Sequence, residues 1–363
     1  MHVRIRDGPG GDRKQAHGQT EPRRGRGVHI GERVFLPLVR IAETHRIEDE
    51  FADDEGLIDG GIDPGIGAVV FYEEPIRGAN AQPAVAERSL KATDPARNRV
   101  FPVEVWYPEA AGGADALPLI LFSHHSGGSR RASTFLTTHL ASHGYLVAAM
   151  DHSEVVAPEL LRKENETPEQ KANRGEGWIA SRVPDLRFLL DYMLSQQLPE
   201  VRVDADRIGA VGHSFGGWTV LEAPRVEPRI RSVVALAPGG SRKRRPGIIP
   251  ATAEFRWTRE VPLLVVAADQ DACLPMDGMY ELFERAPEPK KMVVLERADH
   301  MHFVDDVEKS HEAFRTMPVE GDLAKIQADM RPIAELCTGE EAHRFIQDVT
   351  LAHFNATLKG QDH

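Results

Sequence analysis

The spacing of apolar residues changes repeatedly along this chain, and each change predicts a switch between strand and helix. Continuous apolar runs of strand length, such as LPLILFSHH at 117–125 and VPLLVVAAD at 261–269, are typical of strands buried on both faces. Between such runs, residues 181–196 repeat their apolar positions at helical spacing, which predicts an amphipathic helix. The remaining predicted strands are residues 68–74, 99–109, 145–152, 207–214, 230–238 and 290–299.

Strands that alternate with helices predict an α/β fold. A mostly parallel central sheet with helices on both faces would bury these runs and would carry its site at the carboxyl edge of the strands. We assign this fold to residues 68–330 and treat 331–363 as a C-terminal helical segment packed on the same domain. The connection 154–181 is too long for a tight turn and follows a strand end, so it predicts a cap or entrance flap. A surface excursion without a role is the alternative.

The first part of the chain lacks this periodicity. Residues 1–30 are rich in arginine, glycine and polar groups, which favours a flexible tail. Residues 43–67 combine acids with glycines, but the acids do not alternate as an EF-hand loop requires. We therefore assign residues 1–67 to a flexible basic tail and an acidic linker.

Composition limits the partners and the compartment. Lysine plus arginine number 44 against 56 aspartate plus glutamate, a formal charge of −12, which argues against nucleic acid and anionic membrane surfaces. No apolar run approaches the length of a membrane span. Cys273 and Cys337 imply no disulfide framework. The N-terminus lacks the apolar core of a secretory signal, so we expect a cytoplasmic protein, with secretion left open if the start is misassigned.

The stretch GHSFGG places Ser214 between glycines where a strand pattern gives way to a helix pattern. Gly212 and Gly216 complete the G-x-S-x-G pattern, in which a sharp turn exposes a nucleophilic serine. A serine that only caps a helix is the alternative. The backbone N–H of Phe215, directly after the nucleophile, is the expected first donor of an oxyanion hole.

An activated serine also needs a base, and the base needs an acid that orients it. Asp269 and Asp271 follow the strand at 261–269, where the acid is expected. His300 and His302 follow the next strand, where the base is expected. The chain order serine, acid, histidine matches one known arrangement of the catalytic triad. The glycine-containing loop at 121–129 is the expected source of the second oxyanion donor.

The motifs FSHHSGG, GHSFGG, ADQDACLP and ADHMHF together resemble those of an α/β-hydrolase. Within that superfamily the chain is similar to platelet-activating-factor acetylhydrolases, cutinase-like polyester hydrolases and serine-type relatives of dienelactone hydrolase. The resemblance covers roughly residues 85–315. It departs from the family in the first motif, where His125 stands in place of a glycine.

The resemblance implies a role for each matching residue. Asp271 becomes the acid, because Ala268 and Pro275 frame it as the family frames its aspartate, and His300 becomes the base. The backbone N–H of Ser126 becomes the second oxyanion donor.

These assignments predict a serine esterase that acts through an acyl-enzyme, without metal or organic cofactor. Its partner would be a small-molecule ester with a short acyl group or good solubility, and Trp178 and Trp218 would contribute to the substrate-binding wall. Acyl transfer, amide cleavage and polyester hydrolysis use the same triad and stay open. A catalytically dead hydrolase fold that only binds a ligand is the alternative from another class.

Overall fold

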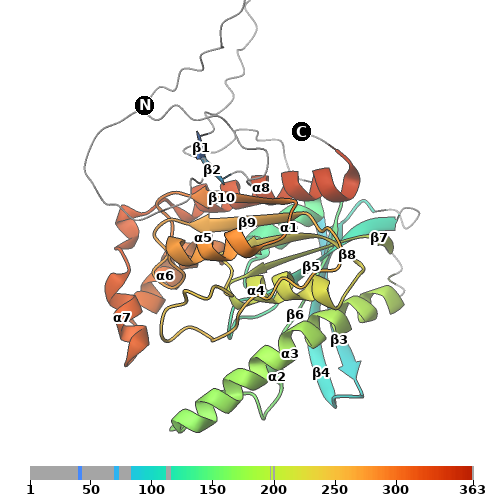
Figure 1. Ribbon diagram of the computed structural model, residues 1–363. Helices are drawn as coiled ribbons and strands as arrows, with labels where there is room; N and C mark the ends of the chain where they lie inside the picture. The colour runs from blue at the N-terminus through green and yellow to red at the C-terminus, as the bar shows by residue number, and fades with distance from the viewer. Residues whose placement is uncertain are drawn as a thin grey trace, which may run out of the picture. The chain divides into compact units, whose positions relative to one another are not determined.

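Figure 1 shows a computed structural model of the chain. It describes residues 40–42, 69–72, 83–111, 116–196, 198 and 201–361. The acidic segment 43–67 and the basic segment 1–30 lie outside the described residues. Between them, the short strand β1 (Arg40–Ala42) pairs antiparallel with β2 (Val69–Tyr72).

The strands of the described residues form one ten-stranded sheet in the order β1-β2-β10-β9-β8-β7-β5-β6-β4-β3. From β2 to β6 in this order all neighbours are parallel, and the pairs β4–β6 and β3–β4 are antiparallel. The predicted mostly parallel sheet is therefore confirmed. The other strands are β3 (Val85–Asp94), β4 (Arg99–Pro108), β5 (Ala116–Ser123), β6 (Leu146–Met150), β7 (Arg202–His213), β8 (Ile230–Leu236), β9 (Leu263–Ala268) and β10 (Lys290–Leu295).

Helices cover both faces of this sheet (Figure 1). They are α1 (Thr134–Ser142), α2 (Ser153–Val156), α3 (Pro168–Ser195), α4 (Phe215–Glu222), α5 (Met276–Arg285), α6 (Val307–Thr316), α7 (Asp322–Asp329) and α8 (Gly339–Lys359). Short 3-10 turns occupy η1 (Ala223–Arg225), η2 (His300–Phe303) and η3 (Ile333–Glu335). Among the described residues, none of the helices has the length and apolar character needed to span a bilayer.

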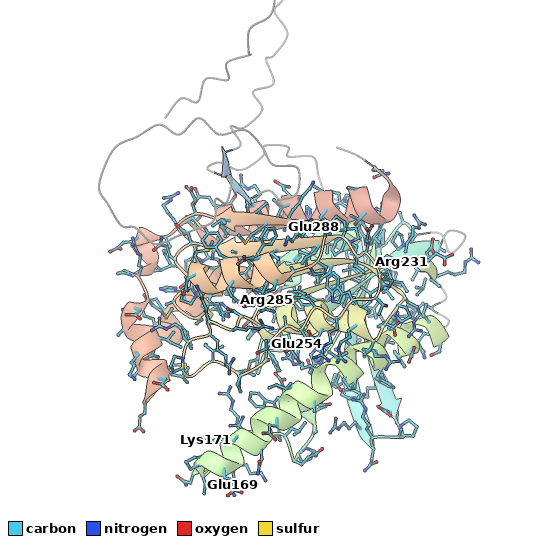
Figure 2. All side chains as sticks on the ribbon, in the orientation of Figure 1. Glu169, Lys171, Arg231, Glu254, Arg285 and Glu288 are labelled. Carbon is cyan, nitrogen blue, oxygen red and sulfur yellow. The ribbon has the colours of Figure 1, made fainter. Side chains whose placement is uncertain are left out.

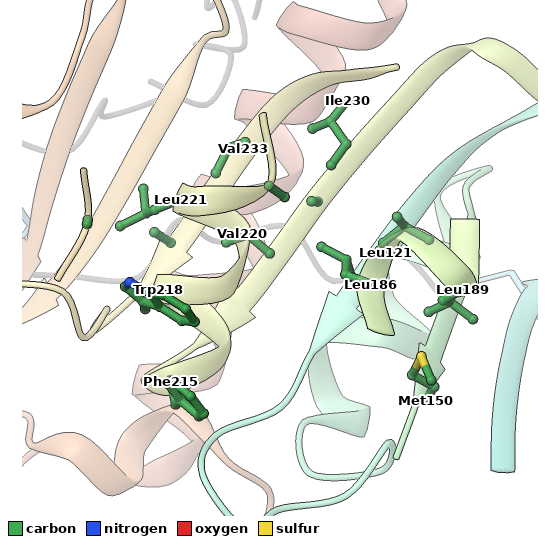
Figure 3. Close-up of a cluster of buried hydrophobic side chains, with 14 of the residues drawn as sticks. Leu121, Met150, Leu186, Leu189, Phe215, Trp218, Val220, Leu221, Ile230 and Val233 are labelled. Carbon is green, nitrogen blue, oxygen red and sulfur yellow. The ribbon is translucent and has the colours of Figure 1, made fainter. Parts of the chain in front are cut away.

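Alternate side chains of each central strand enter two separate cores. Leu119 and Leu121 of β5 belong to the core under α3, α4 and α5, whereas Ile120 and Phe122 belong to the core under α1 and α8. In Figure 3, Leu121 lies among side chains of α3, and the side chains of α4 lie towards β8. Burial on both faces explains why these strands are apolar at every position.

The helix α3 begins earlier than its apolar pattern predicts, at Pro168 rather than near 182. Thr167 caps it, accepting a hydrogen bond from the Gln170 N–H, and the Gln170 side chain bonds back to the Thr167 N–H. The first turns are polar all round and exposed, so they carry no periodic apolar signal. In Figures 1 and 2 this end of α3, marked by Glu169 and Lys171, points away from the sheet.

The strands set the place of the site because their carboxyl ends lie in register. Ser123 of β5 lies opposite Gly212 of β7, and Leu236 of β8 lies opposite His213. The chain leaves the sheet after each of these strands, and the loops after β9 and β10 leave it at the same edge. The motifs singled out in the sequence all follow these strand ends.

Candidate active site

Ser214 sits on a strained turn between β7 and α4. Its backbone has φ 58° and ψ −115°, a conformation that residues with a side chain rarely adopt. A β-carbon at Gly212 would collide with the carbonyl of Gly216, and one at Gly216 would collide with the carbonyl of Ser123. The two glycines are therefore required by close backbone approach, and the tight turn leaves the Ser214 side chain partly exposed.

Three side chains from different loops form a continuous hydrogen-bonded chain. His300 Nε2 lies 2.8 Å from Ser214 Oγ, and His300 Nδ1 lies 2.7 Å from Asp271 Oδ2. The other oxygen of Asp271 accepts the N–H groups of Cys273 and Leu274, each at 2.8 Å. Asp271 is 4% exposed and His300 8% exposed, so both are held away from bulk water. The structure thus brings together the serine, acid and histidine predicted from the sequence.

The two reserve residues have other partners. Asp269 accepts a hydrogen bond from the Ala298 N–H, which ties the loop after β9 to the loop after β10, and a second one from the adjacent Gln270 side chain. His302 lies 2.9 Å from an oxygen of Asp299, and its other ring nitrogen lies 3.0 Å from the carbonyl of Cys337. Both residues brace the loop that carries His300.

The electrostatic surroundings distinguish His300 from the other histidines near Ser214. Burial alone would lower the pKa of His300, but the charge and hydrogen bond of Asp271, together with the charge of Asp299, outweigh it and raise that pKa. Burial lowers the pKa of His125 to about 4 and that of His213 well below its ordinary value, and the nearby His300 adds to both shifts. At neutral pH, His125 and His213 are therefore uncharged.

Asp271, Cys273 and His300 offer ligand atoms that all lie within 4.8 Å of one another, the spacing of a possible metal site. The carboxylate and the imidazole already bond to each other, however. Burial, and then the charge of Asp271, raise the pKa of the Cys273 thiol well above its ordinary value, which disfavours the thiolate that a metal needs. Cys273 and Cys337 are both free and buried.

Two backbone N–H groups lie just after β7 and β5, whose carboxyl ends share one edge of the sheet. Phe215 is the first residue of α4, so its N–H precedes the intrahelical hydrogen bonds. Ser126 lies in the loop after β5, and no hydrogen bond occupies its N–H in the part of the chain that the structure describes. Both groups can donate a hydrogen bond to a ligand oxygen, as the oxyanion prediction requires, and that role stays a prediction.

A second set of serine, histidine and aspartate is hydrogen-bonded in the same order, and it was not predicted from the sequence. His152 Nε2 lies 2.8 Å from Ser123 Oγ, and His152 Nδ1 lies 3.3 Å from Asp185 Oδ2. All three residues are 0% exposed. Asp185 falls on the buried face of α3, where a charged residue among leucines signals a buried polar network.

Both predicted substrate-wall tryptophans lie in the core with structural partners. The Trp178 indole donates to the carbonyl of Leu160, and the Trp218 indole donates to the carbonyl of Thr252. Trp218 also stacks on the ring of Phe215, 5.2 Å between centroids. Contact between either residue and a substrate stays a prediction. A separate hollow of about 410 Å³ is lined by residues of α6 and α8 and by Phe135, and includes none of the three hydrogen-bonded residues.

The chain is similar to several known proteins. The family described as platelet-activating factor acetylhydrolase, isoform II, matches residues 102–185. The chain is 24% identical to a platelet-activating factor acetylhydrolase of Cavia porcellus over 68% of its own length and 61% of that protein. It is 28% identical to a bis(hydroxyethyl) terephthalate hydrolase of Streptomyces coelicolor, over 47% of this chain and 45% of that one.

A solved structure, the ferulic acid esterase of Streptomyces cinnamoneus, superposes with a TM-score of 0.56 at 22% identity. The superposition covers 80% of this chain and 94% of that one. The chain has the α/β-hydrolase fold. Within that fold it resembles the group of platelet-activating-factor acetylhydrolases and cutinase-like hydrolases, as the sequence motifs predicted. The chain spans between about half and three-fifths of the length of the curated relatives named above.

Proposed function

We propose that this α/β-hydrolase is a serine hydrolase that cleaves carboxylic esters through an acyl-enzyme. The observation that carries the proposal is the unbroken hydrogen-bonded chain from Ser214 Oγ through His300 to Asp271, set on a strained turn at the sheet edge. A serine hydroxyl is a weak nucleophile at neutral pH unless a base takes its proton. A neutral His300, 2.8 Å from the hydroxyl, is placed to do so.

In the first half-reaction Ser214 Oγ attacks the ester carbonyl and its proton passes to His300 Nε2. Asp271 keeps the Nδ1 proton in place and stabilises the imidazolium. The N–H groups of Ser126 and Phe215 donate hydrogen bonds that stabilise the negative charge developing on the carbonyl oxygen. The ester bond breaks as His300 returns the proton to the departing alkoxide, which leaves as an alcohol.

In the second half-reaction water attacks the acyl-enzyme. His300 takes a proton from the water and then gives it to Ser214 Oγ as the acid leaves. These steps balance without metal or cofactor, so the proposal requires neither. The free carboxylic acid and the restored serine are the products.

The names of the sequence relatives support a small ester as substrate. They describe an acetylhydrolase, a bis(hydroxyethyl) terephthalate hydrolase and a cutinase. The exposed polar turns at the start of α3 are consistent with a water-soluble ester rather than a lipid droplet. We therefore propose short acyl or soluble esters, with the segment 154–181 forming part of the rim of the site.

Two measurements test the proposal together. The purified protein is treated with a fluorophosphonate, which labels an activated serine, and is assayed on p-nitrophenyl esters of graded acyl length. We expect labelling at Ser214 and fastest turnover of short acyl esters. Labelling without turnover of any ester would point to transfer or amide cleavage instead. A wild-type protein that is neither labelled nor active would be a binding protein built on this fold.

A further inference from the structure

Arg182 is a fully buried cation that the proposed reaction does not use. It lies on α3, is 0% exposed, and forms a two-pronged ion pair with Glu154 of α2. Its Nε donates to Glu154 Oε2 at 2.7 Å and its Nη2 donates to Oε1 at 2.6 Å. A buried pair of this kind is weak evidence for stability, because desolvation offsets most of the attraction. Its position therefore calls for another explanation.

The ion pair of Arg182 and Glu154 is hydrogen-bonded to the loop that follows β5. Arg182 Nη1 donates to the carbonyl of His124 at 2.6 Å, and Arg182 Nη2 donates to the carbonyl of His125 at 3.1 Å. From the other side, Glu154 Oε1 accepts the N–H of Gly127 at 2.8 Å. Three consecutive peptide groups of the loop are thus hydrogen-bonded to one ion pair.

The peptide between His125 and Ser126 is held through its carbonyl, which accepts from Arg182, also accepts the N–H of Gly128 at 3.1 Å, and lies 2.6 Å from His124 Nδ1. The carbonyl of His125 and the N–H of Ser126 belong to the same planar trans peptide, so they point in opposite directions. A carbonyl turned towards Arg182 therefore turns the Ser126 N–H away from it. Within the part of the chain that the structure describes, no hydrogen bond occupies the Ser126 N–H.

We propose that Arg182 and Glu154 are positioning residues for the oxyanion hole, which hold the peptide between His125 and Ser126 with its N–H directed at the reacting carbonyl. This inference rests on the proposed esterase function. The opposite orientation of the peptide would place a carbonyl, which repels an oxyanion, where the N–H is needed. It would also leave the guanidinium of Arg182 short of a buried acceptor.

The side chain at position 125 makes the clamp more important. The family pattern has glycine there, whereas His125 packs its ring against Gly128, leaving no room for a β-carbon at that glycine. The loop therefore combines a bulky residue with a tight turn.

Burial would raise the pKa of Glu154, but Arg182 outweighs it and lowers that pKa, so the pair remains charged at neutral pH.

The first test replaces Arg182 by lysine, which keeps the charge but has only three N–H donors on one atom and so cannot replace the four bonds to Glu154 and the two carbonyls. Loss of one oxyanion donor lowers kcat by about 10²–10³-fold, so we expect misplacement of one donor to lower it by about 10–100-fold. KM should change by less than about threefold, because the donor acts mainly in the transition state. A folded Arg182→Lys protein with kcat within threefold of wild type would overturn the proposal.

Arg259→Lys is the matched control. Arg259 also donates to two backbone carbonyls, those of Glu227 and Ile230, but at the opposite end of β8 from Ser214. We expect its kcat to stay within about twofold of wild type. A loss equal to that of Arg182→Lys would mean that any arginine bonded to two backbone carbonyls matters equally, and would contradict a specific role. Thermal unfolding of both variants shows that each is folded.

The second test does not depend on turnover. The double variant Arg182→Gln/Glu154→Gln removes both charges together, which avoids an unpaired buried ion. We expect its crystal structure to show the peptide between His125 and Ser126 rotated or in two orientations. An unchanged peptide would overturn the proposal whatever the kinetics. If the wild type cleaves no ester, the esterase function is refuted. A rotated peptide in the double variant would still show that Arg182 and Glu154 hold this peptide.

Discussion

Two sets of serine, histidine and aspartate lie within one molecule. Each set is linked in the same order, and the distance between histidine and aspartate is longer in the second set. Ser214, His300 and Asp271 are linked at 2.8 and 2.7 Å, whereas Ser123, His152 and Asp185 are linked at 2.8 and 3.3 Å. Hydrogen-bond geometry alone would accept either set as a catalytic triad. What separates them is where each serine sits and which charges surround each histidine.

The serines differ in backbone and access. Ser214 has a strained positive φ on a turn and is partly exposed, whereas Ser123 ends β5 and is fully buried. The Ser123 hydroxyl also lies 3.3 Å from Arg182 Nη1. A substrate can reach the first serine, and the second has its polar atoms occupied within the protein.

The histidines differ in the sign of their pKa shift. Burial lowers the pKa of His152, Arg182 lowers it further, and Asp185 does not compensate. For His300, two carboxylates, Asp271 and Asp299, outweigh burial and raise the pKa. A base that must hold a proton during catalysis needs the second environment. The charges around each histidine, and the exposure of each serine, therefore favour the first set for the proposed reaction.

The largest expected effect separates the two serines. Ser214→Ala should lower kcat by about 10⁴-fold or more, because no other group can form the acyl-enzyme. Ser123→Ala should leave kcat within about threefold. It should instead lower the free energy of unfolding by about 1–3 kcal/mol, since it leaves His152 Nε2 without its hydrogen-bond partner. Ester turnover and urea unfolding of both variants measure this. A reversed outcome would make the buried set the catalytic one.

The next comparison concerns the aspartates. Asp271→Asn should lower kcat by about 10⁴-fold, because the amide favours the wrong tautomer of His300. Asp185→Asn should spare kcat but cost about 3 kcal/mol, since Asp185 also pairs with Arg97 in the protein interior. Asp269→Asn is the control for Asp271 and should lose less than about threefold. Equal losses for Asp269 and Asp271 would contradict the assignment.

A smaller effect is expected in the pH profile. His300 must be neutral to take the serine proton, so activity is present above its pKa and lost as pH falls through it. Because that pKa is raised, the acid limb of kcat/KM should have its midpoint above about 6.5, the value of free imidazole. Asp299→Asn should move the midpoint down. A midpoint below 6.5 in wild type would contradict the direction of the shift.

The smallest expected effect concerns access of substrate to Ser214. Replacing residues 161–173 by a short glycine-serine linker removes exposed turns and keeps Glu154 and Arg182. If this segment forms part of the rim, KM or acyl-length preference should change by about two- to fivefold while kcat for a small ester is kept. Unchanged selectivity in a folded variant would show that the segment has no part in binding.

The sequence predicted features that are encoded locally or by chain order. The glycines around Ser214 are fixed by backbone collisions within a few residues, so the turn could be read from the motif. The continuous apolar strands likewise reported burial on both faces. The strand β3 was missed because it lies at the sheet edge and carries exposed charged residues.

The sequence could not predict partners that are distant in the chain. Arg182 meets Glu154 and the carbonyl of His124 only after α3 packs on the sheet. One signal was available. Trp178, Arg182 and Leu186 are spaced four residues apart, so they share a helix face, and a charge on that face implies a buried partner.

The positive φ of Ser214 has a consequence for evolution in the laboratory. Such a conformation costs about 1–3 kcal/mol for a residue with a side chain and almost nothing for glycine. Ser214→Gly should therefore melt at a higher temperature than Ser214→Ala, although both are inactive. Selection for thermostability alone would favour loss of the nucleophile, so a screen for hardier variants of this protein must score turnover at the same time.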